Sequence, residues 1–202
     1  MHTPMRRFVA RLAATAFVAA SLLIATGSAS AAPITDEDTF VLTVFPHDTP
    51  AVNFWDSWGA SRSGGRGHKG TDIMSPRGTE VLAAADGIVT DFGSQRLSGY
   101  FIRLDHGDGW TTTYMHLNND TLGTDDGEGG IWAAIHPTIA VGTEVEAGDI
   151  IGYVGDSGNA EDTQPHTHFE VKKDGEKVNP YPFLKDALDR ERRYSQAELL
   201  PL

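Results

Sequence analysis

The sequence HTHFEV at residues 166–171 decides the fold that we expect for this chain. Side chains alternate along a β-strand with a period of two, so His166 and His168 would point to one face and Thr167 to the other. Two adjacent imidazoles on the face of an apolar strand cost stability unless they have a partner. We therefore predict that both rings face one functional site.

Two further segments supply histidine, and one of them adds a carboxylate: HKGTD at residues 68–72 and YMHL at residues 114–117. An extended strand would hold His68 and Asp72 about 13 Å apart, so they can share a metal ion only if the backbone bends. Catalytic zinc keeps three protein ligands, commonly imidazole and carboxylate, and one open position. Remaining histidines can transfer protons near neutral pH. The glycines expected to allow the bend are Gly64, Gly65, Gly67 and Gly70.

Short runs of β-branched and aromatic residues predict an all-β, mainly antiparallel fold. We expect a small β-sandwich or half-barrel with a loop-lined groove and a short C-terminal helix. The sequence GTEV at residues 78–81 recurs at residues 142–145, which is weak evidence for two similar halves. The predicted strands are 40–45, 80–84, 87–91, 100–105, 110–117, 150–154 and 168–172, and the predicted helix is 181–200.

The N-terminus has the features of a secretory signal peptide over residues 1–31. Three arginines precede an apolar run, and Ala29-Ser30-Ala31 has the small-residue spacing that signal peptidase cleaves. The alternative is an uncleaved anchor, but the apolar run is shorter than the roughly 20 residues of a membrane span. We predict a secreted or extracytoplasmic protein without stable membrane insertion after processing. Its predicted parts are a tether and first strand at residues 32–44, a main domain at 45–184, and a C-terminal helix or tail at 185–202.

The charge and the composition exclude several classes of protein. The net charge is -12, and it becomes -15 without residues 1–31, which carry three arginines and no acidic residue. That balance argues against nucleic acid as a partner, because phosphates require basic patches. The chain has no cysteine, which excludes disulfides, thiolate metal sites and a lipid-modified N-terminal cysteine. Nothing in the sequence assigns an oligomeric state.

Three other histidines are expected to have local roles. His106, in a hairpin turn, should be solvated, and His47 and His136, in loops, should lie at the surface or bond locally. The acidic residues of the long connection 118–141 lack the spacing of a helix-loop-helix calcium loop, so a solvated turn is expected. Aromatic residues between residues 46 and 67 either cover the edge of the core or line a substrate groove. The acidic residues are Asp125, Asp126 and Glu128, and the aromatic residues are Phe54, Trp55 and Trp58.

Taken together, HKGTDI at residues 68–73, YMHL at 114–117 and PHTHFEV at 165–171 resemble the three signature segments of lysostaphin-type (LytM-like) zinc endopeptidases of peptidoglycan. The segments GTEVLAAADGIV and GTEVEAGDIIGYVGDSGN also resemble this family, so the likeness covers residues 45–184. The resemblance implies a single Zn²⁺ cofactor. The implied metal ligands are His68, Asp72 and His168, and the implied catalytic residues, acting on the water and the oxyanion, are His116 and His166.

The function implied by the resemblance is a secreted metalloendopeptidase that hydrolyses peptide bonds in peptidoglycan stem peptides or cross-bridges, with a histidine as general base. Two features depart from the family. Thr167 stands where leucine is usual; it points away from the paired imidazoles, so we expect a small effect on the metal. Some relatives have an oxyanion-donating tyrosine shortly before the first histidine, but none occurs between Phe45 and His68, and Arg62 or Arg66 could take that role.

Several alternatives remain open. A catalytically silent domain of the same fold could bind cell wall or regulate another hydrolase, but we would expect such a domain to lack ligands. A lipoyl or biotinyl carrier needs a lysine at a hairpin tip, and none lies between Lys69 and Lys172. Two histidines and a carboxylate also form the facial triad of non-haem iron oxygenases. Neither a His-Glu-x-x-His helix nor a Gly-x-Ser-x-Gly elbow occurs.

Overall fold

The computed structural model describes residues 40–49 and 51–198. The predicted signal peptide and most of the predicted tether lie outside these residues. Within them, no helix combines the length and the apolar character that a membrane span requires.

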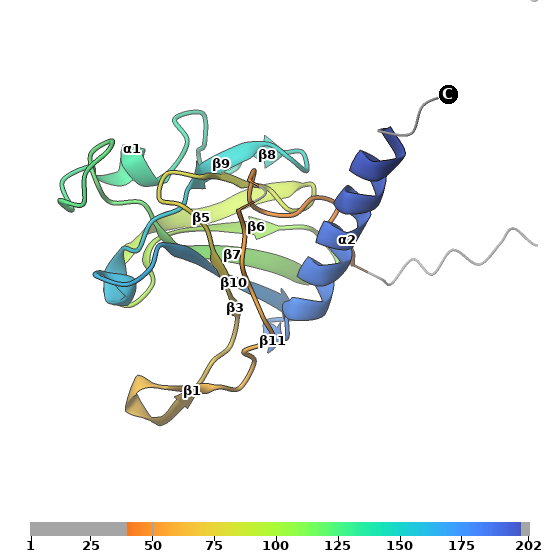
Figure 1. Cartoon of the computed structure of the whole chain (residues 1–202), viewed down its shortest axis with the longest axis horizontal. Helices are drawn as coiled ribbons and strands as arrows, with labels where there is room; N and C mark the ends of the chain where they lie inside the picture. The colour runs from red at the N-terminus through yellow and green to blue at the C-terminus, as the bar shows by residue number, and fades with distance from the viewer. Residues whose placement is uncertain (1–39, 50, 199–202) are drawn as a thin grey trace, which may run out of the picture. The chain divides into compact units, whose positions relative to one another are not determined.

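One antiparallel sheet of seven strands contains the strands that position the site (Figure 1). Its hydrogen-bonded order is β11-β10-β7-β6-β5-β8, and β3 also pairs with β10. The predicted all-β, mainly antiparallel fold is thus confirmed, with β7 at the predicted bounds. The strands are β3 Thr71–Met74, β5 Gly87–Gln95, β6 Gly99–Asp105, β7 Trp110–Leu117, β8 Glu144–Val145, β10 His166–Lys173 and β11 Glu176–Val178.

Strand β10 organises this sheet because three strands pair with it. One edge pairs with β7 from His168 to Lys173. The other edge pairs with β3 at residues 166–169 and with β11 at residues 171–173. The antiparallel register places Asp72 directly opposite His168.

The core lies between the large sheet and a second sheet formed by β4 and β9. Alternation along β10 buries Thr167, Phe169 and Val171 completely, whereas His166 and His168 on the opposite face are partly exposed. Burying the apolar face of each sheet is the main favourable contribution to folding. The remaining elements are β1 Ser61–Arg62, η1 Ser63–Gly65, β2 Arg66–Gly67, β4 Glu80–Leu82, α1 Ile131–Ala134, β9 Ile150–Tyr153, η2 Gly158–Ala160 and α2 Tyr181–Glu198.

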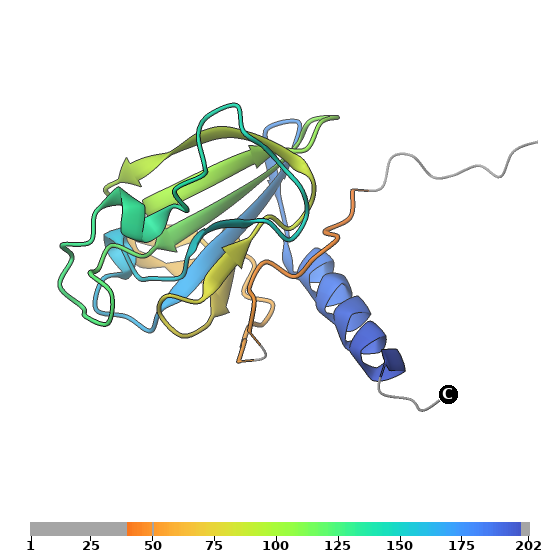
Figure 2. The same cartoon turned by 90° about the horizontal axis from the view of Figure 1, so that it is seen from above.

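Residues 40–49, here called the N-terminal strap, form no regular strand, so the strand predicted at residues 40–45 is wrong. Leu42 and Phe45 are buried, and the Val44 amide donates to the Ala84 carbonyl over 3.1 Å. The β-type composition therefore reflects burial rather than continuous pairing. The strap runs alongside α2, where the Phe45 amide donates to Glu191 Oε1 over 2.6 Å (Figure 2).

Helix α2 confirms the predicted C-terminal helix and begins at the predicted residue, Tyr181. Leu184 and Ala187 of its buried face belong to the core. The two GTEV sequences each run from a turn into a short strand, and the two strands lie in different sheets, since β4 pairs with β9 and β8 pairs with β5. They therefore mark a repeated turn and strand.

Candidate active site

His68, Asp72 and His168 come together where β3 pairs with β10. Asp72 Oδ1 lies 3.1 Å from His68 Nε2 and 2.9 Å from His168 Nδ1, and these two nitrogens are 2.9 Å apart. Ligands at about 2.0–2.2 Å from a tetrahedral zinc ion are roughly 3.3–3.6 Å from one another. The three donor atoms, one from each side chain, therefore lie slightly closer together than zinc ligands do. A small outward movement of the side chains would let them hold one cation.

The bend between His68 and Asp72 depends on Gly70. A Cβ atom at this position would lie 2.5 Å from His168 Nε2 and 2.7 Å from the Phe169 carbonyl oxygen. Such distances are far inside van der Waals contact, so only glycine lets the chain pass the His168 ring. The bend predicted from the sequence is therefore present, and Gly70 is the glycine that the packing requires.

The second nitrogen of each of these rings is bonded away from the cluster. His68 Nδ1 lies 2.9 Å from Ser57 Oγ, and His168 Nε2 lies 3.2 Å from Glu170 Oε1. A nitrogen that donates a proton behind the ring leaves the other nitrogen as a lone-pair donor to a metal. The sequence interpretation missed both partners. Glu170 could have been found, because it lies two residues after His168 and so shares its face of β10; Ser57 has no such signal.

Charges around the cluster favour an anionic carboxylate. Burial by itself would raise the pKa of Asp72, but hydrogen bonds from His168 and His68 hold it well below its ordinary value. Burial opposes protonation of His168, yet its bonds to Asp72 and Glu170 raise the pKa of the ring. Glu170 is buried, and its contacts with His168 and Lys177 lower the pKa of its carboxyl group. Asp72 therefore supplies the negative charge that a divalent cation needs.

Arg62 reaches this cluster from the hairpin of β1 and β2. Its guanidinium contacts Asp72 Oδ2, the carboxylate oxygen that does not face the histidines. Of the two arginines considered as oxyanion donors, the structure thus places Arg62 on a predicted metal ligand. Because this contact engages Oδ2, Oδ1 is left to the cluster.

His116 and His166 lie beside the three donors. The centroid of the His116 ring is 5.1 Å from that of His166 and 6.0 Å from that of His168. Strict alternation along β7 would put His116 on the core face with Tyr114, but His116 has φ 59. This left-handed conformation is uncommon for a residue other than glycine and turns the ring toward His166.

The orientation of His116 is fixed by Ser157. The Ser157 carbonyl accepts a hydrogen bond from His116 Nδ1 over 2.9 Å, and the Ser157 hydroxyl donates to the Leu117 carbonyl over 2.5 Å. His166 Nδ1 similarly lies 2.8 Å from the Gln164 carbonyl oxygen. Since a carbonyl oxygen only accepts, Nδ1 carries the proton in both rings, and Nε2 is left as a proton acceptor.

Burial, followed by repulsion from His166, lowers the pKa of His116 to about 4. The ring is therefore neutral at neutral pH. A buried, neutral imidazole whose Nε2 can accept a proton beside three candidate metal ligands has the properties of a general base.

Two histidines expected to have local roles form longer-range bonds. His47 is buried between Ser75 and Thr167. His106 is partly buried between the Asp86 carbonyl and Thr112 Oγ1, so the expected solvated role is wrong. Both imidazoles link segments that are distant in the sequence, a role that their neighbours in the sequence do not indicate.

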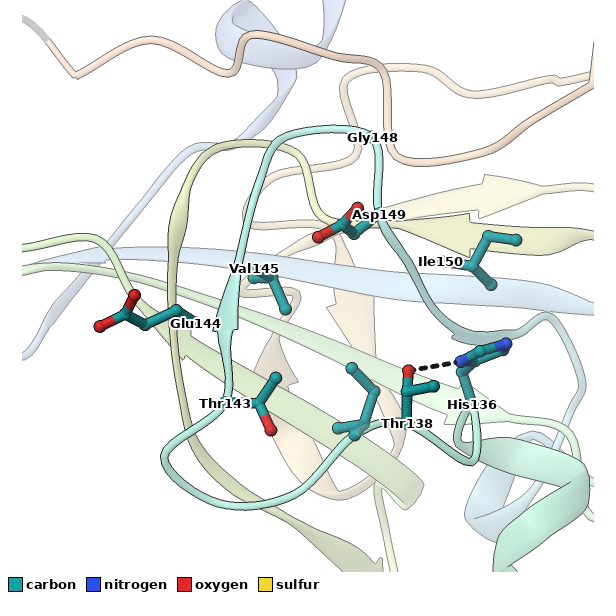
Figure 3. A pocket seen from close by; sticks show the side chains of 9 residues that line it. His136, Thr138, Thr143, Glu144, Val145, Gly148, Asp149 and Ile150 are labelled. Carbon is teal, nitrogen blue, oxygen red and sulfur yellow. Dashed lines mark hydrogen bonds between the residues drawn. The ribbon is translucent and has the colours of Figure 1, made fainter.

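A pocket of about 450 Å³ lies apart from the histidine cluster and shares no residue with it (Figure 3). His136 contributes to it and bonds locally, with Nδ1 2.8 Å from Thr138 Oγ1. The pocket therefore adds nothing to the candidate active site. Its lining residues are His136, Thr138, Ile139, Thr143, Glu144, Val145, Gly148, Asp149 and Ile150.

A second group of carboxylates, Asp120, Asp125 and Asp156, lies in and beside the long connection after β7. The guanidinium of Arg77 contacts all three. Asp126 accepts hydrogen bonds from two backbone amides of its own loop and from the Thr121 hydroxyl. The positive charge that faces these three carboxylates is thus the guanidinium of Arg77.

Phe54, one of the aromatic residues before His68, takes the first of the two expected roles. Phe54 packs against Phe45 and Tyr181, with ring centroids 5.4 and 5.7 Å apart, and so covers the edge of the core. Trp55 is exposed, and Lys69 Nζ lies 4.8 Å from the centroid of the Trp58 ring.

The chain resembles known peptidases over its central part. DD-carboxypeptidase/endopeptidase Mpg of Neisseria meningitidis is 34% identical over 113 residues, which make up 56% of this chain and 22% of Mpg. Peptidoglycan DD-endopeptidase ShyC of Vibrio cholerae is 30% identical over 57% of this chain and 22% of its own. The chain thus spans about a fifth of the length of these relatives.

Solved structures agree with the sequence comparisons. The catalytic domain of the antimicrobial peptidase lysostaphin from Staphylococcus simulans superposes with a TM-score of 0.52 and 29% identity, covering 66% of this chain and 92% of that domain. The family model of Peptidase family M23 matches residues 66–180, more than half of the chain. The chain therefore belongs to peptidase family M23, whose lysostaphin-type members its signature segments resemble.

Proposed function

We propose that this protein is an exported, zinc-dependent endopeptidase that hydrolyses peptide bonds in the stem peptides or cross-bridges of peptidoglycan. The observation that carries the proposal is the convergence of His68 Nε2, Asp72 Oδ1 and His168 Nδ1 within 3.1 Å of one another. Membership of peptidase family M23 supports the reaction, and the peptidoglycan endopeptidases among the relatives support the substrate. Since peptidoglycan lies outside the cytoplasm, this substrate agrees with the signal peptide predicted at residues 1–31.

The donor set suits zinc, which binds imidazole nitrogen and carboxylate oxygen and, at catalytic sites, three protein ligands. His68, Asp72 and His168 would hold the ion, with Ser57 and Glu170 orienting the two rings from behind. When bound, zinc would supply Lewis acidity and lower the pKa of a coordinated water.

The two remaining histidines would move the protons. His116 is neutral at neutral pH, and its Nε2 would accept a proton from the attacking water. The same nitrogen would then return that proton to the leaving amine. His166 has its Nδ1 proton on the Gln164 carbonyl, so it can donate from Nε2 only when protonated, and in that state it would stabilise the oxyanion.

Substitution of single histidines separates these roles. We expect His116→Ala and His166→Ala to keep zinc and to lose about 10²–10⁴-fold in turnover, the usual contribution of general acid-base catalysis. We expect His68→Ala and His168→Ala to lose zinc and activity together. Zinc content can be measured by elemental analysis, and turnover by mass spectrometry of fragments released from peptidoglycan of known cross-linking, with and without a chelator.

Two outcomes would contradict the proposal. Loss of zinc in His116→Ala or His166→Ala would make that residue a ligand. Stoichiometric zinc in the wild-type protein, with no fragments released from any peptidoglycan, would leave a domain that binds cell wall or regulates another hydrolase.

A further inference from the structure

His47 lies on the core side of β10, where it bonds two buried hydroxyl groups. Its Nδ1 is 2.7 Å from Ser75 Oγ, and its Nε2 is 2.9 Å from Thr167 Oγ1. The Ser75 hydroxyl donates to the Met74 carbonyl oxygen over 2.9 Å, so it must accept from Nδ1. Nε2 then carries a lone pair and accepts the hydroxyl proton of Thr167. Both ring nitrogens of a neutral imidazole are thereby satisfied.

The two hydroxyls belong to the strand ends that present the candidate ligands. Ser75 directly follows β3, which carries Asp72, and Thr167 lies in β10 between His166 and His168. In the part of the chain that the structure describes, pairing of β10 with β7 begins only at His168. On that side His166 instead bridges Gly155, whose carbonyl accepts from the His166 amide over 2.9 Å. The side-chain bond at Thr167 adds a second restraint to this end of the strand, where β7 no longer pairs.

The backbone around His47 is itself fixed by β4. His47 forms an isolated bridge with Val81, and the Asp48 amide donates to the Glu80 carbonyl over 3.1 Å. The Leu82 amide donates to the Pro46 carbonyl over 2.9 Å. His47 therefore connects the small sheet to the ends of β3 and β10 in the large sheet. Burial, with repulsion from His166, lowers the pKa of His47 to about 3, which keeps the ring in the neutral form that these bonds require.

We infer that His47 is a positioning residue, which fixes the ends of β3 and β10 and thereby the distances among the three candidate zinc ligands. This inference rests on the proposed function and extends it to a residue outside the family match at residues 66–180. It also revises the role of Thr167. Its side chain points away from the paired imidazoles, as expected, but its hydroxyl ties their strand to His47.

Three variants test the inference. His47→Leu removes both hydrogen bonds and leaves the Thr167 hydroxyl buried without its acceptor. His47→Gln keeps a donor and an acceptor, because the amide nitrogen can face Ser75 and the amide oxygen can face Thr167. His106→Leu is the matched control: His106 Nε2 also bonds a strand threonine, Thr112 Oγ1 at 2.8 Å, but at the opposite end of β7 from His116.

The full-length protein should be examined by competition with a chromophoric zinc chelator, by the absorption spectrum of its cobalt-substituted form, and by separate kcat and KM values. We expect His47→Leu to lower zinc affinity by about tenfold or more, a loss typical of altered support behind metal ligands, and to change the cobalt spectrum and kcat more than KM. His47→Gln should keep most of the zinc affinity. His106→Leu should lower the melting temperature and leave the metal measurements unchanged.

The inference is overturned if His47→Leu matches His106→Leu in every measurement, because His47 would then only stabilise the fold. If His47→Leu does not fold, Thr167→Val removes the same hydrogen bond at nearly constant volume. An unchanged zinc affinity and cobalt spectrum in Thr167→Val would equally overturn the inference. Wild-type protein that binds no zinc would instead overturn the proposed function, and the inference with it.

Discussion

At the scale of single residues, each site histidine has one ring nitrogen bonded behind it and the other turned toward the site. Ser57 holds His68, Glu170 holds His168, and the Ser157 carbonyl holds His116. Such supporting groups set which nitrogen carries the proton and how basic its partner is. The chemistry of the cluster therefore depends on supporting residues as well as on the five candidate site residues.

Glu170 gives the sharpest test at this scale. We expect Glu170→Gln to lower zinc affinity about 10–100-fold, because the amide can still accept from His168 Nε2 but no longer supplies negative charge behind the ring. Glu176→Gln is the control, since Glu176 is exposed on the neighbouring strand. Chelator competition measures both variants, and equal affinities would show that the Glu170 charge does not act on the metal.

The five candidate residues could be predicted to lie together from the sequence. Short motifs and the alternation of side chains along a strand relate residues that are close in the chain. His166 and His168 share a face by period two, and His68 and Asp72 are joined by a glycine-containing bend. Ser57 is eleven residues from His68 along the chain. Only the tertiary structure brings its hydroxyl to the ring, so a pattern in the sequence could not reveal it.

At the scale of elements, the strands with strong β-propensity were predictable and the short ones were not. Strand β7 has the predicted bounds, because its first five residues, 110–114, are all β-branched or aromatic. Strand β3 was missed because its four residues are stabilised by pairing with β10 rather than by their own composition. The opposite error occurred in the N-terminal strap, where apolar residues are buried without continuous strand partners.

Arg77 forms ion pairs with carboxylates in and beside the connection after β7, and the contribution of these pairs to stability can be measured. Arg77→Met leaves the buried carboxylates of Asp120 and Asp156 without a countercharge. We expect the free energy of unfolding to fall by about 3–5 kcal/mol, as when one partner of a buried ion pair is removed. Urea unfolding of zinc-free protein measures the change.

Lys185→Met is the control for this prediction, because the exposed Lys185 pairs with Asp189 on the surface of α2 and should matter little. If both variants unfold at the same urea concentration as the wild type, Arg77 does not stabilise the connection.

At the scale of the whole molecule, several buried histidines make stability depend on pH. Burial lowers the pKa of His47 to about 3, of His116 to about 4, and of His106 below its ordinary value. The unfolded chain binds a proton at each of these rings near pH 6.5, whereas the folded chain does not. The stability contributed by the neutral rings is thus complete above about pH 6.5 and is lost progressively as the pH falls toward the folded values.

His47→Gln isolates one of these contributions. Between pH 7 and pH 5, the wild-type protein should lose about 2 kcal/mol more unfolding free energy than His47→Gln, which has no ring to protonate. Urea unfolding of zinc-free protein at both pH values measures the difference. An identical pH dependence in the two proteins would mean that His47 is protonated equally in the folded and unfolded chains.

The N-terminal strap has a practical consequence for anyone who grafts this family M23 domain into a chimera. The family match begins at residue 66, yet His47, Ser57 and Arg62 reach the site from earlier in the chain. A transplant cut at the start of the match would keep every signature motif and discard the side chains that hold them in register. The portable unit therefore begins with the strap and extends through α2, where Glu191 accepts a hydrogen bond from the strap.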